Sequence, residues 1–447
     1  MPLVPLATGA YKRANGFTPE VECLNMYVEP DKSGVSPDNV QRIQRPGLTL
    51  FGTMPGVSQA LFQQDGVLSG AVFGVAAGSL YQVAASTTNL GSVGGSSGYI
   101  AMCATKFGVF TLAGGILKFW NGTTLTTIPT PVGYTPIDLD TINNYVIVAM
   151  SSGRFYWIVP GAVVIDLLNF ATAESSPDGL VAVRRVGSEF WLFGGTSIEP
   201  WQPTGDSNAP FQLASGRIYS RGCASAASVR RFDNSVIWVG EDGNVYRGDS
   251  TPTKISDHGV DERIRLAGAS TTSALTFDAD GHKFYALRVG STATMVYDAS
   301  TQEWWKASSG GYAYWRAAFS APDLSGYVAD SDSGAVWSID AANATDAGTA
   351  FTRKVTGTVP IMGGPPRNDS FSVGMSASAN CTVKLRWRDG QDDYPAFYEE
   401  LAMRAPLDVV TCYRLGQPDQ PYRTFEVSVD DPVIVRIAGA KANEGFN

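Results

Sequence analysis

An aromatic residue recurs at the end of short, β-rich runs along most of this chain. From about residue 62 to residue 340 the runs are four to seven residues long, rich in Val, Ile, Tyr, Phe and Trp, and separated by Gly, Asn, Asp and Ser turns. Each marker is followed by a turn and then by a more polar run. The seven markers, spaced by 37 to 51 residues, are Tyr81, Trp120, Trp157, Trp201, Tyr246, Tyr297 and Trp337.

A unit of about 40 to 45 residues with four short strands and no helix is typical of a β-propeller blade. One four-stranded sheet cannot bury both faces, so blades stack around an axis and the ring closes to remove exposed edges. We predict an all-β protein with a propeller of about seven blades, six or eight being possible. A row of β-sandwich domains is the alternative. It fits less well because the units share no Trp–Cys spacing and one unit is too small to fold alone.

Composition agrees with a chain of hairpins. Glycine makes up 48 of the 447 residues and charged residues only 17%, whereas average proteins have about 7% glycine and about 25% charged residues. Tight turns are therefore abundant and charged helix faces scarce.

The pattern divides the chain into three parts. Residues 57–350 form the predicted propeller. Residues 1–56 are Pro-rich and irregular, which predicts an arm that orders only against another surface. Residues 351–447 contain alternating strands and predict a β-sandwich-like domain, with one short helix at 397–404.

Charge and cysteine usage limit the class of protein. The net charge of −9 excludes a protein that holds nucleic acid through overall basic charge. Five scattered cysteines form neither a disulfide framework nor a metal site, and we interpret them as buried thiols of a reducing compartment. The start of the sequence does not read as a secretory signal, and no long uncharged apolar run predicts a membrane span. We expect synthesis in a cytoplasm.

Residues suited to catalysis are few. His258 and His282 are the only histidines, and both lie in polar segments that predict exposed turns. Neither has a partner at a metal-ligand spacing, and phosphate-binding, dinucleotide and nucleophile-elbow motifs are missing. We therefore predict no enzyme, no catalytic or metal residues and no cofactor.

One hairpin motif supports the propeller. The segment from Asp332 through Gly334 to Trp337 resembles the Asp-box of sialidase propellers, in which Asp and Gly fix a tight turn and Trp packs between blades. That motif is structural even in enzymes. A sialidase would also need an arginine cluster with a Tyr and a Glu, which the sequence does not identify.

Arginine outnumbers lysine by 23 to 10. Arginine forms bidentate contacts at interfaces, so the local cluster predicts pairing between subunits. Ordinary surface ion pairs explain any single member equally well. The candidates are Arg217, Arg221, Arg230 and Arg231.

Several patches along the chain share the order and spacing of one known family, and they are residues 9–11, 23–30, 45–48, 222–247, 385–389, 413–416 and 425–433. They resemble the packaged-DNA stabilisation, or tail nozzle, proteins of short-tailed phages related to the Salmonella phage P22. Those proteins carry an N-L-Y-x-E stretch followed by P-G-L; here Met26 replaces the usual Leu. The loop at 387–394 departs from the usual W-S-D-D-G-G-x-x-W turn, which predicts a rebuilt hairpin.

The resemblance implies a ring, usually a homohexamer, at the distal end of a virion tail. It implies that the ring sits on an adaptor ring below the portal, continues the DNA channel without sequence-specific binding, retains the genome, and anchors fibres or spikes and a plug or needle. An acidic bore would let DNA slide, so we expect channel loops to be acidic and the arginines to face neighbouring subunits. The residues expected to dock on the adaptor or a neighbour are Asn25, Tyr27, Glu29, Pro30, Pro46, Gly47 and Leu48.

Two other functions remain open. A glycan-binding tail adhesin would expose aromatic residues such as Trp304 and Trp305 on a sugar-binding face. A glycan-cleaving propeller would carry a pocket with two carboxylates at the spacing of a hydrolase.

Overall fold

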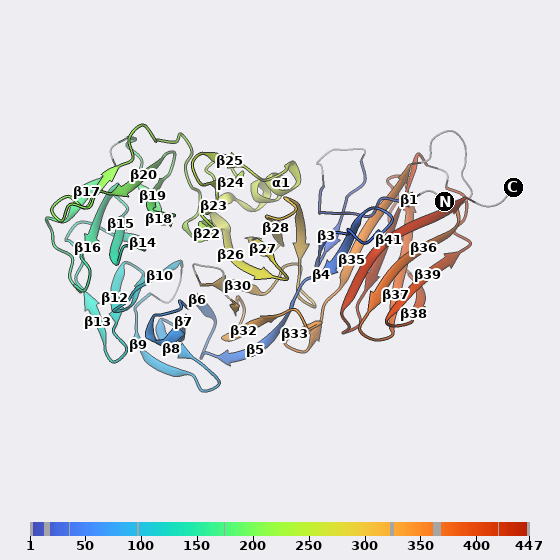
Figure 1. Ribbon diagram of the computed structural model, residues 1–447, viewed down its shortest axis with the longest axis horizontal. Coiled ribbons are helices and arrows are strands. Elements are labelled where there is room, and N and C mark those ends of the chain that lie inside the picture. The colour runs from blue at the N-terminus through green and yellow to red at the C-terminus, as the bar shows by residue number, and fades with distance from the viewer. Residues whose placement is uncertain are drawn as a thin grey trace.

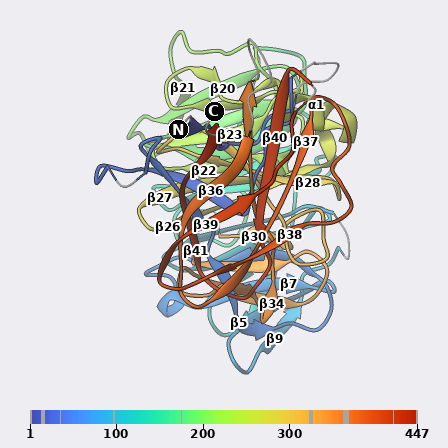
Figure 2. The ribbon, with the colours of Figure 1, turned by 90° about the vertical axis from the view of Figure 1, so that its right-hand side faces the viewer.

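The computed structural model describes residues 3–12, 18–34, 36–95, 98–173, 175–321, 326–360, 368–418 and 420–444. Two β-rich parts lie side by side along the long axis: a ring of blades and a pair of packed sheets (Figure 1). Figure 2 views the molecule along that axis from the end with the packed sheets, whose strands lie in front of the ring. The predicted all-β class is confirmed.

Seven blades of four antiparallel strands form the ring; five are separate sheets and two are parts of larger sheets. Blade 1 consists of β6 (Ser58–Phe62), β7 (Val72–Ala76), β8 (Ser79–Val83) and β9 (Thr88–Ser92), and blade 2 consists of β10 (Ile100–Thr105), β11 (Gly108–Ala113), β12 (Ile116–Trp120) and β13 (Leu125–Ile128). Blade 3 consists of β14 (Pro136–Ile142), β15 (Tyr145–Met150), β16 (Arg154–Ile158) and β17 (Phe170–Thr172), and blade 4 consists of β18 (Leu180–Val186), β19 (Glu189–Gly194), β20 (Ile198–Pro203) and β21 (Phe211–Leu213).

Blade 5 consists of β22 (Arg230–Phe232), β23 (Ser235–Val239), β24 (Val245–Gly248) and β25 (Pro252–Lys254). Blade 6 consists of β26 (Thr272–Ala279), β27 (His282–Val289), β28 (Ala293–Asp298) and β29 (Trp304–Ala307). Blade 7 consists of β30 (Ala317–Ser320), β31 (Tyr327–Asp330), β32 (Ala335–Asp340) and β5 (Gly47–Thr53). Short strands β33 (Thr345–Asp346) and β34 (Thr349–Ala350) extend the last sheet. The first strands of successive blades contact one another around the whole ring, and β30 contacts β6. Seven blades are therefore present, as predicted.

Every aromatic marker lies on the third strand of its blade and is buried. The markers thus report one repeating position between stacked sheets. Local turn chemistry shapes the hairpins: Asn143 and Asn144 between β14 and β15, and Asp280 and Gly281 between β26 and β27, all have positive φ. Two successive residues with positive φ match the twist of the strands on either side of a tight hairpin turn.

The segment expected to be an irregular arm is built into the fold. Strand β5 pairs antiparallel with β32, Leu48 opposite Ile339, and so supplies the outer strand of the last blade. The propeller therefore begins at residue 47, ahead of the expected boundary. The physical reason is that a ring closed by a strand from its own N-terminus leaves no blade with a missing partner.

The second part is a β-sandwich that also recruits N-terminal strands. One sheet runs β3 (Met26–Pro30), β4 (Val40–Gln44), β41 (Val435–Glu444), β36 (Asn368–Ala377) and β39 (Leu407–Tyr413), with β1 (Leu3–Val4) on β41. The other runs β2 (Cys23–Leu24), β35 (Arg353–Pro360), β40 (Tyr422–Val429), β37 (Cys381–Asp389) and β38 (Glu399–Met403). The helix expected at 397–404 is wrong: this segment contains β38, which pairs with β37.

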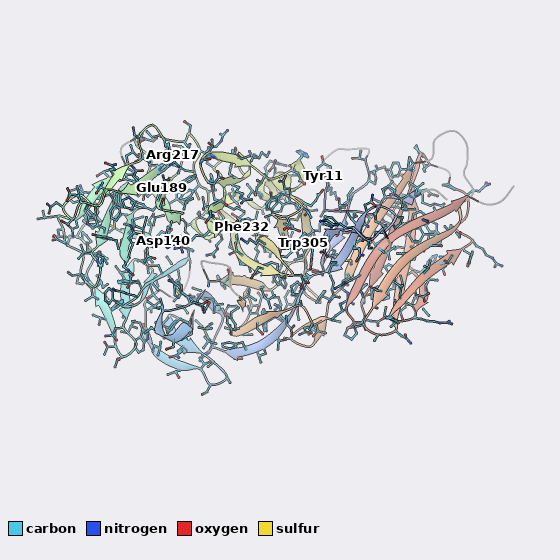
Figure 3. The ribbon with its side chains drawn as sticks, viewed as in Figure 1. Tyr11, Asp140, Glu189, Arg217, Phe232 and Trp305 are labelled. Atoms are coloured by element: carbon cyan, nitrogen blue, oxygen red, sulfur yellow. The ribbon has the colours of Figure 1, made fainter. Side chains whose placement is uncertain are left out.

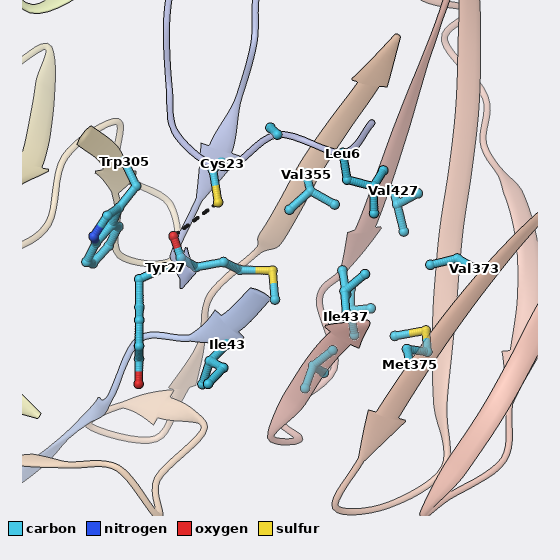
Figure 4. Packing of buried hydrophobic residues seen from close by; sticks show 14 of the residues in the cluster. Leu6, Cys23, Tyr27, Ile43, Trp305, Val355, Val373, Met375, Val427 and Ile437 are labelled. Atoms are coloured by element: carbon cyan, nitrogen blue, oxygen red, sulfur yellow. Dashed lines mark hydrogen bonds between the residues drawn. The ribbon is translucent and has the colours of Figure 1, made fainter. Parts of the chain in front are cut away.

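One hydrophobic core joins the sandwich to blade 6. Phe371 and Phe425 stack between the two sheets with ring centroids 4.4 Å apart. Towards the propeller, Tyr27 packs against Trp305 and Phe284 (Figure 4). Leu24 of β2 pairs with Lys306 on one side and Lys354 on the other, so blade 6 and the sandwich share one continuous sheet.

Helices are short. Helix α1 (His258–Ala267) begins after Asp257, whose side chain accepts a hydrogen bond from the Val260 amide, and single 3₁₀ turns occur at Leu68–Gly70, Ala226–Ser228 and Ala269–Thr271. In the part of the chain that the structure describes, no helix is long and apolar enough to cross a membrane. All five cysteines are buried and free, as the sequence predicted.

Candidate functional site: the axial cavity of the propeller

A cavity of about 480 Å³ lies on the axis of the ring. Its wall comes from the first strands of the blades or the segments just before them, so no single blade defines it. It combines apolar side chains with hydroxyl groups and charges, among them Ile100, Asp140, Arg184, Arg230, Ser273 and Ser320. Figure 3 shows Asp140 on the side of the ring opposite Trp305.

Asp138 and Asp140 stand on β14 two residues apart, which puts both side chains on the same face of the strand. Both are buried. Asp138 accepts hydrogen bonds from the Tyr99 hydroxyl (3.0 Å), the Val183 amide (2.9 Å) and Arg184. Although burial opposes it, Asp138 and Tyr99 raise the pKa of Arg184, so this guanidinium stays charged.

Asp140 has a separate arginine. Arg231 donates to both of its carboxylate oxygens, and the amides of Thr141 and Arg185 donate at 2.6 and 2.8 Å. Burial alone would raise the pKa of Asp140, but Arg231 and Arg184 hold it below its ordinary value. Asp138 and Asp140 thus accept hydrogen bonds from Tyr99 at the start of blade 2, from Val183, Arg184 and Arg185 of blade 4, and from Arg231 of blade 5. They tie these blades to blade 3.

The structure separates the four arginines of the predicted inter-subunit cluster. Arg231 is buried against Asp140 and Arg230 is half-buried in the axial cavity, so the assignment of these two to a subunit surface is corrected. Arg217 forms an ion pair with Glu189 (2.6 Å) on the outer side of the ring (Figure 3). Arg221 is exposed beside the Tyr246 ring.

Most of the predicted docking residues are internal. Asn25, Tyr27, Pro46, Gly47 and Leu48 are buried within the chain itself, because the strands to which they belong complete the last blade and the sandwich. Their assignment to a docking surface is corrected. The two remaining residues of this set, Glu29 and Pro30 at the end of β3, are exposed.

Asn25 and Arg45 form a buried polar junction between propeller and sandwich. The Asn25 amide oxygen accepts from Arg45 Nε (2.8 Å) and from the Ser308 amide (2.8 Å), while its nitrogen donates to the Thr352 carbonyl (2.7 Å). Arg45 binds both carboxylate oxygens of Asp346 at 2.9 and 2.7 Å. The ion pair of Arg45 with Asp346 leaves no local pattern in the sequence because its members are 301 residues apart.

Other predicted residues have mixed outcomes. His258 is exposed at the start of α1. His282 is buried and bonded to Asp298, so the expectation of an exposed turn is wrong for it. Trp304 and Trp305, which a glycan-binding face would expose, are buried. Within the described residues, no group of three or more His, Cys, Asp or Glu side chains is placed to hold a metal ion.

A sequence signal for the cavity did exist. The apolar strand 136–142 carries aspartates at alternate positions, and the apolar strand 180–186 carries two adjacent arginines. Charges on buried strands need partners, so Asp138 and Arg184 could have been paired in advance.

Solved structures similar to this chain include U3-55K (10% identity, 66% of this chain and 99% of that chain, TM-score 0.43), the WD40 β-propeller domain of Doa1 (12%, 65% and 97%, 0.42) and BamB from Moraxella catarrhalis (12%, 65% and 98%, 0.41). No curated protein matches the chain. The family model described as bacteriophage P22 Gp10, β-propeller, matches residues 3–342.

Proposed function

Because this chain belongs to the bacteriophage P22 Gp10 β-propeller family, we propose that it forms the nozzle ring of a short phage tail. The chain is a structural protein of a bacteriophage. In the proposed ring, six copies continue the DNA channel below the adaptor, retain the packaged genome, and anchor fibres or spikes and a plug or needle. The observation that carries this proposal is the family match, which includes the N-terminal strands as well as all seven blades.

The charge of the chain supports passage of DNA without capture. Its net charge is −9, and phosphate is held by basic surfaces. Arg184 and Arg231 lie inside the propeller, where they pair with Asp138 and Asp140. We expect the bore of the ring to be lined mainly by acidic and neutral loops. A reconstruction with a bore lined chiefly by arginine would contradict this part of the proposal.

An apolar surface on blade 3 supports burial in an assembly. Val163, Val164, Leu167 and Leu168, between β16 and β17, are all exposed, Leu168 to 83%. Apolar groups gathered in this way commonly mark an interaction surface, and we assign this one to a neighbouring copy. The double substitution Val164→Asp with Leu168→Asp should prevent ring formation while leaving the thermal unfolding midpoint of the monomer unchanged. A ring that still assembles would exclude this contact.

The adaptor contact is assigned to the exposed end of β3. Glu29 and Pro30 remain on the surface. Deleting the whole N-terminal segment would not test this contact, because the deletion would also remove strands of the propeller and of the sandwich. Glu29→Arg is therefore the appropriate test, with Glu400→Arg, at an exposed glutamate of β38, as a matched charge reversal. We expect the first to weaken adaptor binding and the second to leave it unchanged.

A structural role also agrees with the state of the cavity carboxylates. Asp138 and Asp140 both accept hydrogen bonds from arginine, so neither is available as the acid or nucleophile of a glycosidase. We expect no degradation of host polysaccharide and no binding on a glycan array. Binding to one glycan class would instead favour the adhesin.

The decisive experiment is electron microscopy of the purified chain mixed with its adaptor ring. Negative-stain images should show a six-fold stub that extends the adaptor. Monomers that never bind the adaptor, or open filaments in place of closed rings, would refute the proposal.

A further inference from the structure

We propose that the axial cavity binds a phosphate-type oxyanion, held chiefly by Arg230. This site is independent of the proposed role in the tail, because it lies inside each propeller. It is built from a half-buried guanidinium, a cavity of about 480 Å³ and several hydroxyl groups on the wall.

Arg230 differs from the other arginines around the cavity. Among the described residues, its guanidinium makes one hydrogen bond, from Nε to the carbonyl of Ala274 on the neighbouring blade (2.5 Å). That bond occupies Nε and leaves the two terminal nitrogens without a hydrogen bond among the described residues, and Arg230 lines the cavity. Arg184, by contrast, donates to Asp138, Tyr99 and the carbonyls of Val183 and Val229.

The nearby carboxylates do not neutralise Arg230. Among the described residues, the guanidinium groups of Arg184, Arg230 and Arg231 share this region with the carboxylates of Asp138 and Asp140, which pair with Arg184 and Arg231. No described carboxylate pairs with Arg230. Burial, together with repulsion from Arg184, lowers the pKa of Arg230. A half-buried cation without a partner is costly, and an anion would relieve that cost.

The remaining wall groups favour a phosphate. A guanidinium offers two parallel donors to two oxygens of one anion. Ser273 lies on the same wall, and its hydroxyl could donate to another oxygen of a tetrahedral group, whereas the Ser320 hydroxyl already donates to the Ala321 carbonyl. The volume is sufficient for inorganic phosphate and for a small phosphate monoester, so both belong to the proposed class.

Isothermal titration of the full chain with inorganic phosphate, at constant ionic strength set by sodium chloride, tests the site. We expect one saturable site per chain and a thermal midpoint that rises with phosphate concentration. Arg230→Gln should weaken phosphate binding at least about tenfold, the loss expected for one charge-assisted contact. Arg265→Gln, which removes an exposed arginine of α1, should bind as the unmodified chain does.

A second variant keeps the test informative if Arg230→Gln fails to fold. Ser273→Glu places a carboxylate on the cavity wall, where it should replace the anion, raise the thermal midpoint without phosphate and abolish phosphate binding. Glycerol phosphate in place of inorganic phosphate distinguishes a monoester ligand from the free ion. No saturable binding, or equal binding by the Arg230→Gln variant, or unchanged phosphate affinity in the Ser273→Glu variant, would overturn the assignment.

Discussion

His282 connects the stability of the propeller to pH. Its Nδ1 lies 2.7 Å from an Asp298 carboxylate oxygen, and its ring contacts Tyr27. The hydrogen bond with Asp298 raises the pKa of His282 against the opposing effect of burial, and Glu29 and Asp280 add to the rise. A folded-state pKa above the unfolded value means that the protonated form stabilises the fold. This contribution is complete below about pH 6.5 and is lost as pH rises through the folded pKa.

His282→Gln should therefore remove a stabilisation that is present at pH 6 and absent at high pH. Urea unfolding of the two proteins at pH 6 and pH 9 measures the difference, which should be larger at pH 6. His258→Gln, at an exposed histidine, serves as the control. If His282→Gln and the unmodified chain lose stability in parallel across this range, the interpretation fails.

Arg45 is the residue on which the junction of the two parts most depends. It is completely buried, pairs with Asp346, and lies over the Phe351 ring at 3.8 Å. Removing one partner of a buried ion pair leaves the other charge uncompensated and costs about 3 to 5 kcal/mol. We expect a loss of this size in the free energy of unfolding for Arg45→Met. Arg265→Met, in an exposed pair with Glu262, should cost less than about 1 kcal/mol.

Single residues were predictable where burial alone decides their place. The cysteines and the aromatic markers were placed correctly because apolar side chains avoid water whatever their partner. Arg45, Asn25 and His282 were misplaced or missed because a polar residue is buried only when a partner is available. The partners of Asn25 and Arg45 lie 283 and 301 residues away in the sequence. The partner of His282 is Asp298 on the neighbouring strand, 16 residues away.

At the level of strands, the blades pair with strands near them in the sequence, whereas strands of the N-terminal segment pair with distant ones. Each blade is local in sequence, so alternation and turn residues define it. Strands β1 and β2 have two residues each and pair with strands more than 280 residues away. Two residues carry no periodicity. Strands β4 and β5, of five and seven residues, complete sheets whose other strands lie far along the chain, and an irregular arm was predicted for these two reasons. The axial cavity was missed for a related reason, since it needs the first strands of all the blades together.

Closure of the ring by β5 yields a matched pair of substitutions on one strand. Leu48 is completely buried in the core, whereas Leu50 is 57% exposed. Removing a buried leucine side chain leaves a cavity and costs about 2 to 5 kcal/mol. Leu48→Ala should therefore lower the free energy of unfolding by this amount, and Leu50→Ala should change it little. Equal effects in denaturant titrations would show that β5 does not complete the blade.

For the molecule as a whole, the two parts depend on one N-terminal segment. Strand β4 pairs with β41, and β2 pairs with β35, so the sandwich lacks part of both sheets without residues 1–46. We expect a fragment of residues 351–447 to be unfolded by circular dichroism. The same fragment joined to residues 1–46 should gain β structure and unfold cooperatively. Cooperative unfolding of the shorter fragment would disprove this dependence.

The closing strand also sets an order of events during synthesis. Leu48 leaves the ribosome about 290 residues before its partner Ile339, and translation proceeds at about 5 to 20 residues per second. Strand β5 therefore waits on the order of 15 to 60 seconds for the other strands of the last blade. During that interval it can pair with the open blade of another nascent chain on the same message. Slower translation late in the gene would lengthen the exposure and favour exchanged dimers over closed monomers.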